Sequence, residues 1–171
     1  ITGIRHALEL DPLSLLGNLE LGCASYYGRQ YDQAIKGFQE TLILYPNTPL
    51  ASWGLARALA QNKMYPEAIS ELTKAKTASQ DLPDIIAELG YVHAVSGNKV
   101  EAKRFLQELT EQTKRRYVNP YLMAIVYVGL DEKDETFAWL DKAYAERSLY
   151  MPWLRVEPKW DPLRSDPRFA A

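Results

Sequence analysis

The fold is decided by residues 19–38, which read LELGCASYYGRQYDQAIKGF. Apolar residues recur every three to four positions on both sides of a short break, which is the spacing of one face of an α-helix. Gly22 and Ala34 are small residues that let two helices approach closely, and Phe38 continues the apolar face of the second helix. Gly28 lies in the break, where a glycine supplies the left-handed backbone that ends a helix. The stretch therefore predicts two helices joined by a tight turn.

The same pattern recurs along the chain at a step of 34 residues. Ala34 is followed by Ala68 and Ala102, and Thr136 continues the series with the next small residue. Other series with this step are Leu21, Leu55, Leu89 and Met123; Gly22, Ala56, Gly90 and Ala124; and Phe38, Leu72, Leu106 and Leu140. A helical hairpin of this length buries its apolar face only by stacking on its neighbours. The chain is therefore predicted to be an all-α array of repeats.

The breaks between the helices follow the same step. They are Gly28-Arg29-Gln30, Gln61-Asn62-Lys63, Ser96-Gly97-Asn98 and Asp131-Glu132. Glycine and asparagine adopt the left-handed backbone most readily, so Gly28, Asn62, and Gly97 or Asn98 are expected to be the left-handed residues. Pro49 and Pro83 stand at the first position of their units, where a missing N–H costs little.

Composition narrows the classes of partner. Twenty basic and 22 acidic side chains give a net charge of −2, which does not favour nucleic acid or an anionic membrane surface. No apolar run approaches the ~18 residues that a membrane helix needs. Cys23 is the single cysteine, so it excludes an internal disulfide and leaves the redox compartment open, with a lean toward the cytoplasm.

The 34-residue step also predicts the organisation of the chain. The repeat array is predicted to span residues 1–147, with a partial repeat at 1–14 and repeats at 15–48, 49–82, 83–116 and 117–147. Ile4 and Ala7 stand one step before Phe38 and Thr41, so residues 1–11 are expected to be the end of a second helix. Its partner helix would lie upstream in a longer parent protein, and an exposed apolar stripe is expected at this end.

Residues 148–171 break the pattern. Four prolines, the first at Pro152 and the last at Pro167, exclude a long helix. Asp161-Pro162 and Asp166-Pro167 each predict the start of a short helical turn. The segment is too apolar for a solvated tail, with Trp153, Leu154, Val156, Trp160, Leu163 and Phe169. It is expected to cap the last helix pair.

With Leu-Gly in the first helix and Ala, Phe or Leu, and Pro in the second, the array resembles the tetratricopeptide repeat family over nearly all of residues 1–147. Ala56 replaces the usual glycine in the second unit, and Thr136 replaces the usual alanine in the fourth. The resemblance implies a right-handed α–α superhelix of about four repeats that acts as a noncatalytic protein–protein interaction module. The residues from Leu140 to Phe169 are similar to the ends of bacterial multidomain regulators, which implies a larger signalling or transcription-regulatory parent.

In this family the first helix of each repeat lines a concave groove, and the resemblance carries its contact positions onto this chain. The candidate peptide-binding residues are Tyr26, Tyr27, Trp53, Arg57, Glu88, Tyr91, Tyr121 and Ile125. Aromatic residues dominate interface anchors, so an apolar or aromatic peptide is the expected ligand, either as an amphipathic helix or as an extended segment. A clamp for a terminal carboxylate is not expected, because Lys and Asn are replaced by residues such as Leu19 and Cys23. Core packing, self-association and cover by the carboxyl end stay open as alternatives.

No pattern predicts catalysis, a metal site or a cofactor, so the chain is not expected to be an enzyme. His6 and His93 are the only histidines, and His93 falls at a packing position, where a satisfied interhelical histidine is expected. Cys23 has no histidine placed to activate it as a nucleophile. Gly28 and Gly97 belong to the turns and not to a phosphate-binding loop.

The expected partner is therefore a protein or a peptide, with neither direct nucleic-acid binding nor membrane binding in this segment. A homo-oligomerisation module is the first alternative. A helical-repeat RNA binder is the second, but it needs a basic groove, and Glu20, Asp84 and Glu88 argue against one.

Overall fold

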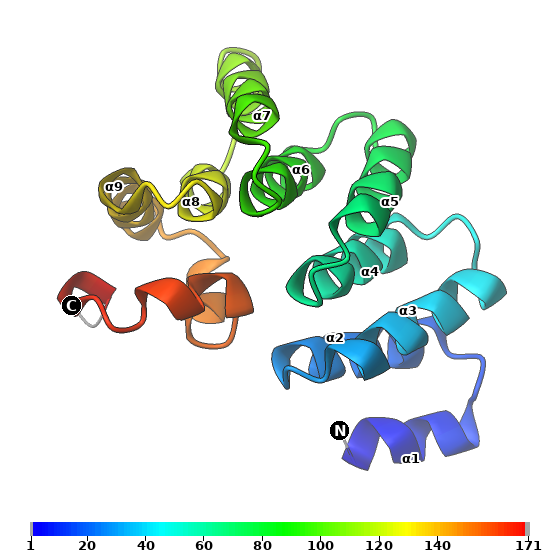
Figure 1. The fold of residues 1–171 in the computed structure, drawn as a ribbon. Helices are drawn as coiled ribbons and strands as arrows, with labels where there is room; N and C mark the ends of the chain where they lie inside the picture. The colour runs from blue at the N-terminus through cyan, green and yellow to red at the C-terminus, as the bar shows by residue number, and fades with distance from the viewer. Residues whose placement is uncertain (1, 170–171) are drawn as a thin grey trace. The chain divides into compact units, whose positions relative to one another are not determined.

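The computed structural model describes residues 2–169, in which nine α-helices are followed by three short 3-10 helices (Figure 1). They are α1 (Thr2–Leu10), α2 (Leu15–Tyr27), α3 (Tyr31–Leu44), α4 (Pro49–Gln61), α5 (Tyr65–Ala78), α6 (Pro83–Val95), α7 (Lys99–Thr113), α8 (Pro120–Gly129), α9 (Lys133–Ala145), η1 (Met151–Arg155), η2 (Pro158–Leu163) and η3 (Pro167–Phe169). The all-α repeat prediction is confirmed. Residues 1 and 170–171, at the ends of the predicted segments 1–14 and 148–171, lie outside the described residues, and the domain boundaries stay predictions.

The chain divides into two compact units, residues 1–80 and 81–171. In unit 1, α2 packs on α3 and α4 packs on α5, so each forms a helical hairpin. In unit 2 the hairpins are α6 with α7 and α8 with α9. Neighbouring hairpins within a unit also touch, since α3 packs on α4 and α6 packs on α8. This stacking of pairs is how a repeat array builds a continuous core.

The turn inside each hairpin has one residue with left-handed backbone. These residues are Arg29 (φ 58°), Lys63 (φ 62°), Gly97 (φ 91°) and Asp131 (φ 61°), and each follows the previous one by 34 positions. In the first turn the N–H of Arg29 donates to the carbonyl of Tyr26, and the N–H of Gln30 donates to the carbonyl of Ser25. This pair of bonds is the Schellman motif, which satisfies the last carbonyls of a helix. The repeat is thus visible in the backbone as well as in the side chains.

The prediction that Gly28 and Asn62 are the left-handed residues is wrong. Gly28 has φ −76° and Asn62 has φ −84°, and each is the last residue of its helical turn. The reversal comes one residue later because the Schellman bonds start from the residue after the cap. In the third turn the same position is occupied by Gly97, and there the expectation is confirmed.

Phe38 is the centre of the unit 1 core, with an exposed fraction of 1%. A Cβ added to Gly22 on α2 would lie 2.7 Å from its ring, and one added to Gly54 on α4 would lie 2.5 Å away. Both helices therefore approach the ring at distances that only glycine allows, and a larger residue would cost about 1–3 kcal/mol through overpacking. The sequence predicted this role for Gly22 and not for Gly54, because Ala56 occupies the repeat position of Gly22.

Exposed leucines stand at the amino end, but the stripe predicted on residues 1–11 stays a prediction, because Ile4 is half-buried and the side chain of Ala7 lies outside the described residues. α1 packs on α2, where a Cβ on Gly17 would meet the side chain of Leu8 at 2.8 Å. The exposed fractions of Leu10, Leu13 and Leu16 are 79%, 62% and 66%.

Within the described residues, no helix combines the length and the apolar composition that crossing a membrane requires.

The carboxyl segment, residues 148–169 as described, forms η1, η2 and η3, and η2 packs on α8 of unit 2. η3 begins after Asp166, as predicted, and Asp166 accepts a hydrogen bond from the N–H of Arg168. η2 differs from the prediction, because it begins at Pro158 and contains Asp161-Pro162 inside it. The side chain of Glu157 accepts from the N–H of Lys159 and so starts the helix earlier.

Candidate functional site

The candidate residues of unit 1 form a cluster around a cation. The guanidinium carbon of Arg57 on α4 lies 4.4 Å from the ring centroid of Tyr26, 5.5 Å from that of Tyr27 and 4.6 Å from that of Trp53. Its Nη2 atom donates to the hydroxyl of Tyr27 at 3.4 Å. Such cation–π contacts stabilise by about 0.5–2 kcal/mol each, depending on desolvation. These four residues are called the Arg57 cluster below.

Members of the Arg57 cluster differ in exposure. Tyr26 is 1% exposed and Arg57 is 5% exposed, whereas Tyr27 and Trp53 are half-buried. Tyr26 also meets the ring of Tyr27 edge-on, with centroids 5.2 Å apart. Tyr26 is therefore a core residue of unit 1, while Tyr27 and Trp53 keep surface that a partner can contact.

Cys23 lies on α2 near the Arg57 cluster. Burial raises the pKa of its thiol, the charge of Arg57 opposes this by lowering that pKa, and Glu20 raises it further. A raised pKa keeps the sulfur protonated at neutral pH, and a protonated thiol is a poor nucleophile. Cys23 therefore contributes packing to this face.

The candidate residues of unit 2 lie beneath the carboxyl segment. Lys159 of η2 places its Nζ atom 3.0 Å from Oε1 of Glu88 on α6, and the side chains of both residues are 1% exposed. The same Nζ lies 3.3 Å from Oε1 of Glu157 and 5.3 Å from the ring centroid of Tyr91. A buried ammonium needs such partners because leaving water costs several kcal/mol. Glu88 and Tyr91 therefore bind a side chain of their own chain.

Trp160 is the second anchor of the carboxyl segment and has an exposed fraction of 0%. Its Nε1 atom donates to the hydroxyl of Tyr121 on α8 at 2.8 Å, and the two rings meet edge-on with centroids 5.3 Å apart. Tyr150 stacks on Tyr121 with centroids 5.3 Å apart. Burying a tryptophan of this kind removes a large apolar area from water, and its N–H keeps a partner.

Tyr150 also ties the segment to the start of α6. Its hydroxyl hydrogen-bonds to the carboxylate of Asp84. Burial and the neighbouring Asp84 carboxylate raise the pKa of the Tyr150 hydroxyl well above its usual range. The hydroxyl is therefore a permanent donor at neutral pH.

Ile125, the last candidate, is buried on α8 one turn after Tyr121, with 7% exposure.

Sequence reasoning did not identify Glu157, Lys159 or Tyr150 as partners of the first-helix face. It did predict that the apolar residues of the carboxyl segment cap the last helix pair, and Trp160 and Leu163 are buried in the described structure. No periodic signal marks Lys159, because the segment lies outside the repeat. The one signal in the sequence for a cation at this face is Glu88 itself, an acidic residue at a groove position.

His93 is an interhelical packing residue, as expected, since its ring stacks on Phe105 of α7 with centroids 5.5 Å apart. The expectation that it is a satisfied histidine is wrong in one respect. Its Nδ1 atom is buried with no hydrogen-bond partner in the part of the chain that the structure describes. Burial lowers the pKa of His93, Glu101 raises it and Arg104 lowers it again.

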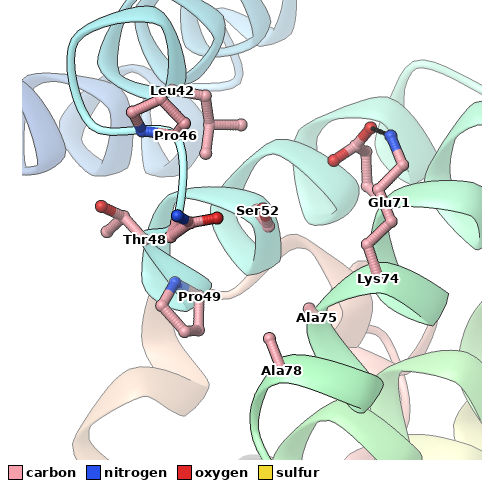
Figure 2. Close-up of a pocket in the computed structure, with 10 residues that line it drawn as sticks. Leu42, Pro46, Thr48, Pro49, Ser52, Glu71, Lys74, Ala75 and Ala78 are labelled. Carbon is pink, nitrogen blue, oxygen red and sulfur yellow. Dashed lines mark hydrogen bonds and ion pairs between the residues drawn. The ribbon is translucent and has the colours of Figure 1, made fainter.

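Each unit also has open hollows on its surface. In unit 1 a hollow of about 370 Å³ lies between the end of α3, the following turn, α4 and α5 (Figure 2). The small side chains of Ala75 and Ala78 leave this space open. Glu71 and Lys74 also line it and form an ion pair, with Oε1 and Nζ 2.6 Å apart. In unit 2 a hollow of about 660 Å³ is lined by residues that include Asp84 and Trp153. Neither hollow contains a residue of the predicted peptide-binding set.

A sequence model of the tetratricopeptide repeat family matches residues 19–83. The matched stretch begins within α2 and runs through α5, so it contains the Phe38 core and the turns at Arg29 and Lys63. A search among curated proteins gave no match. Turns of the same kind follow in unit 2, at Gly97 and Asp131. Residues 19–83 are therefore similar to the tetratricopeptide repeat family, whose repeats generally mediate protein–protein interaction.

Proposed function

We propose that this chain is a noncatalytic, cytoplasmic protein-binding module of a larger regulatory protein, and that the first-helix face of unit 1 holds a peptide segment of the partner. One observation carries the proposal: in unit 2 the equivalent face holds a polypeptide segment, which is the chain's own carboxyl segment. The residues that receive it, Glu88 and Tyr121, were chosen from the sequence as peptide contacts. The family's general role in protein–protein interaction agrees with this.

The repeat relates the two units residue by residue. Arg57 stands one step of 34 residues before Tyr91, and Trp53 stands two steps before Tyr121. In unit 2 both of these positions contact the carboxyl segment, through the Lys159 ammonium and the Trp160 indole. Trp53 and Arg57 are thus the unit 1 residues at positions that already bind a segment elsewhere in the molecule.

The chemistry of the Arg57 cluster favours a partner with an apolar or aromatic side chain. Trp53 and Tyr27 supply half-buried ring surface, and aromatic anchors of this type dominate interface energetics.

A displayed library of random peptides tests the proposal. Selected peptides should be rich in aromatic residues and should bind the native chain and the Trp53→Ala variant with affinities that differ by at least about thirtyfold, the size of an interface hot spot. Trp139→Ala is the matched control, because Trp139 is also half-buried but lies on α9 of unit 2. Circular dichroism should show equal helicity in all three proteins. Equal binding by native chain and Trp53→Ala, or selection of no peptide, would contradict the proposal.

Self-association is the second candidate, and the exposed leucines of unit 1 favour it. Leu10, Leu13 and Leu16 are large apolar side chains exposed to water, and homo-oligomers bury surface of this kind. Sedimentation velocity over a hundredfold range of concentration tests this reading, with Leu13→Ser as the variant that should shift the equilibrium toward monomer. A monomer at every concentration would reject it.

A further inference from the structure

Two neighbouring residues of the carboxyl segment are recognised by different helices of unit 2. Lys159 is held by Glu88 and Tyr91 of α6, and Trp160 is held by Tyr121 of α8. The first is recognised by charge, and the second by a hydrogen bond together with ring contact. Combining a few placed polar groups with apolar surface is how binding sites fix the identity of a ligand. The face therefore has the features of a site that selects a lysine followed by a tryptophan.

The buried ion pair contributes selectivity more than stability. The cost of removing Glu88 and Lys159 from water roughly cancels their attraction, so the pair adds little net free energy. A ligand without a cation at this place would leave the Glu88 carboxylate buried and unpaired, which is strongly unfavourable. The site thus discriminates against segments that lack a basic residue before the aromatic one.

Apart from the buried Leu163 and the contacts of Tyr150 with Asp84 and Tyr121, the remaining contacts of the carboxyl segment are more exposed. Leu149 is 88% exposed and Trp153 is 46% exposed. Arg168 pairs with Asp134 of α9 at 2.8 Å, but the side chains are 46% and 95% exposed, and ion pairs in water contribute little. The 3-10 helices of the segment also have poorer hydrogen-bond geometry than α-helices. A different segment with the same two anchors would therefore recover the contacts that Lys159 and Trp160 make, which are the ones that identify the ligand.

We propose that the face of unit 2 formed by Glu88, Tyr91 and Tyr121 is a binding site for a partner segment in which a lysine precedes a tryptophan, and that the carboxyl segment is its intramolecular occupant. This inference rests on the proposed function and names the ligand chemistry of the second unit. A tethered occupant acts at an effective concentration of roughly millimolar. The native chain therefore binds such a partner weakly, and displacement of the segment opens the site.

A labelled synthetic peptide with the sequence of residues 148–169 is the probe, and the full-length chain is the receptor. Trp160→Ala removes the main apolar anchor of the resident segment, so this variant should bind the peptide at least about tenfold more tightly than the native chain does. A peptide with glutamate in place of its lysine should bind neither protein. Adding Glu88→Gln to Trp160→Ala should weaken binding of the original peptide at least about tenfold. Adding Glu71→Gln instead, at an exposed ion pair of unit 1 outside the binding residues, should leave binding unchanged.

Two results would overturn the inference: equal binding by the native chain and Trp160→Ala, or binding of the glutamate peptide as strong as that of the original. A second measurement covers the case in which Trp160→Ala does not fold. A protease site inserted between Arg147 and Ser148 of the native sequence allows the segment to be cut after folding. The cut segment should remain bound and exchange with labelled peptide; failure of the labelled peptide to bind the cut chain would count against the site.

The outcomes separate this inference from the function proposed above. Failure of the peptide at unit 2, with library peptides still bound through Trp53, removes the second site and leaves the protein-binding function. Failure of both experiments removes the protein-binding function as well.

Discussion

The buried ion pair of Glu88 and Lys159 gives the sharpest prediction for single residues. Glu88→Gln leaves the ammonium of Lys159 buried without its 3.0 Å partner on α6. Breaking a buried pair in this way is expected to lower the free energy of unfolding by about 3 kcal/mol. The triple variant Glu88→Met, Lys159→Met and Glu157→Gln should recover most of the loss, since it removes the buried ammonium together with both carboxylates that face it. Urea denaturation of the native chain and the two variants measures the difference.

Glu71→Gln is the control for this comparison. Glu71 pairs with Lys74 at 2.6 Å, but the lysine side chain is 67% exposed, so the loss should stay below about 1 kcal/mol. Equal losses for Glu88→Gln and Glu71→Gln would show that the Glu88 pair is not desolvated in solution.

His93 gives a prediction in pH. Burial is the largest influence on its pKa and lowers it in the folded chain, so the unfolded chain binds protons first as the pH falls. The free energy of unfolding should therefore be highest above the unfolded pKa of about 6.5 and decrease as the pH falls through the lower folded value. His93→Gln should flatten this slope between about pH 5 and pH 7. Thermal unfolding at several pH values measures it, and an unchanged slope in His93→Gln would contradict the assignment.

At the scale of elements, the turns carry measurable strain. Lys63 holds a left-handed backbone with φ 62°, which a residue with a Cβ adopts at a cost of roughly 1 kcal/mol. Lys63→Gly should raise the free energy of unfolding by about 0.5–1 kcal/mol, and Gly97→Ala, at the equivalent position with φ 91°, should lower it. Chemical denaturation gives both values. A loss of stability in Lys63→Gly would show that the lysine side chain contributes more than the backbone strain costs.

Most of the helices could be predicted from the sequence because the repeat places every element by local spacing. Ala34, Ala68 and Ala102 each have 0% exposure, as the ladder requires. In the first two turns the left-handed residue comes one position later than residue type predicts, because type alone favours Gly28 over Arg29, whereas the hydrogen bonds at the helix end decide the position. The hydrogen bonds that end the helix therefore determine the left-handed position more strongly than the preference of a residue type does.

The occupied face of unit 2 could not be predicted in the same way. Glu88 and Lys159 are 71 positions apart in the sequence, which is farther than any two residues of neighbouring repeats. The 34-residue step therefore does not connect them. Each of the candidate residues was chosen from the repeat position of the first helix. Which of them receive a segment of the same chain depends on non-local contacts that the repeat does not encode.

For the whole molecule, the division into two units predicts that damage stays local. Each hairpin of a repeat array contacts mainly its neighbours, so stability is a sum of local terms. Trp160→Ala should reduce hydrogen-exchange protection in α6 and α8, which the carboxyl segment contacts, and leave protection in α2 and α3 of unit 1 unchanged. Exchange followed by mass spectrometry of peptides from both units measures this. An equal loss of protection in α2 would show that the units unfold together.

The series of left-handed residues at Arg29, Lys63, Gly97 and Asp131 has a further consequence for how this chain can be engineered. Glycine stands at only one of these equivalent positions, in unit 2, and lysine stands one step earlier, in unit 1. Exchanging the two residues leaves the composition of the chain unaltered. It would strengthen one unit and weaken the other by a similar amount, so local opening could be moved along the chain while the total free energy of unfolding stays nearly constant.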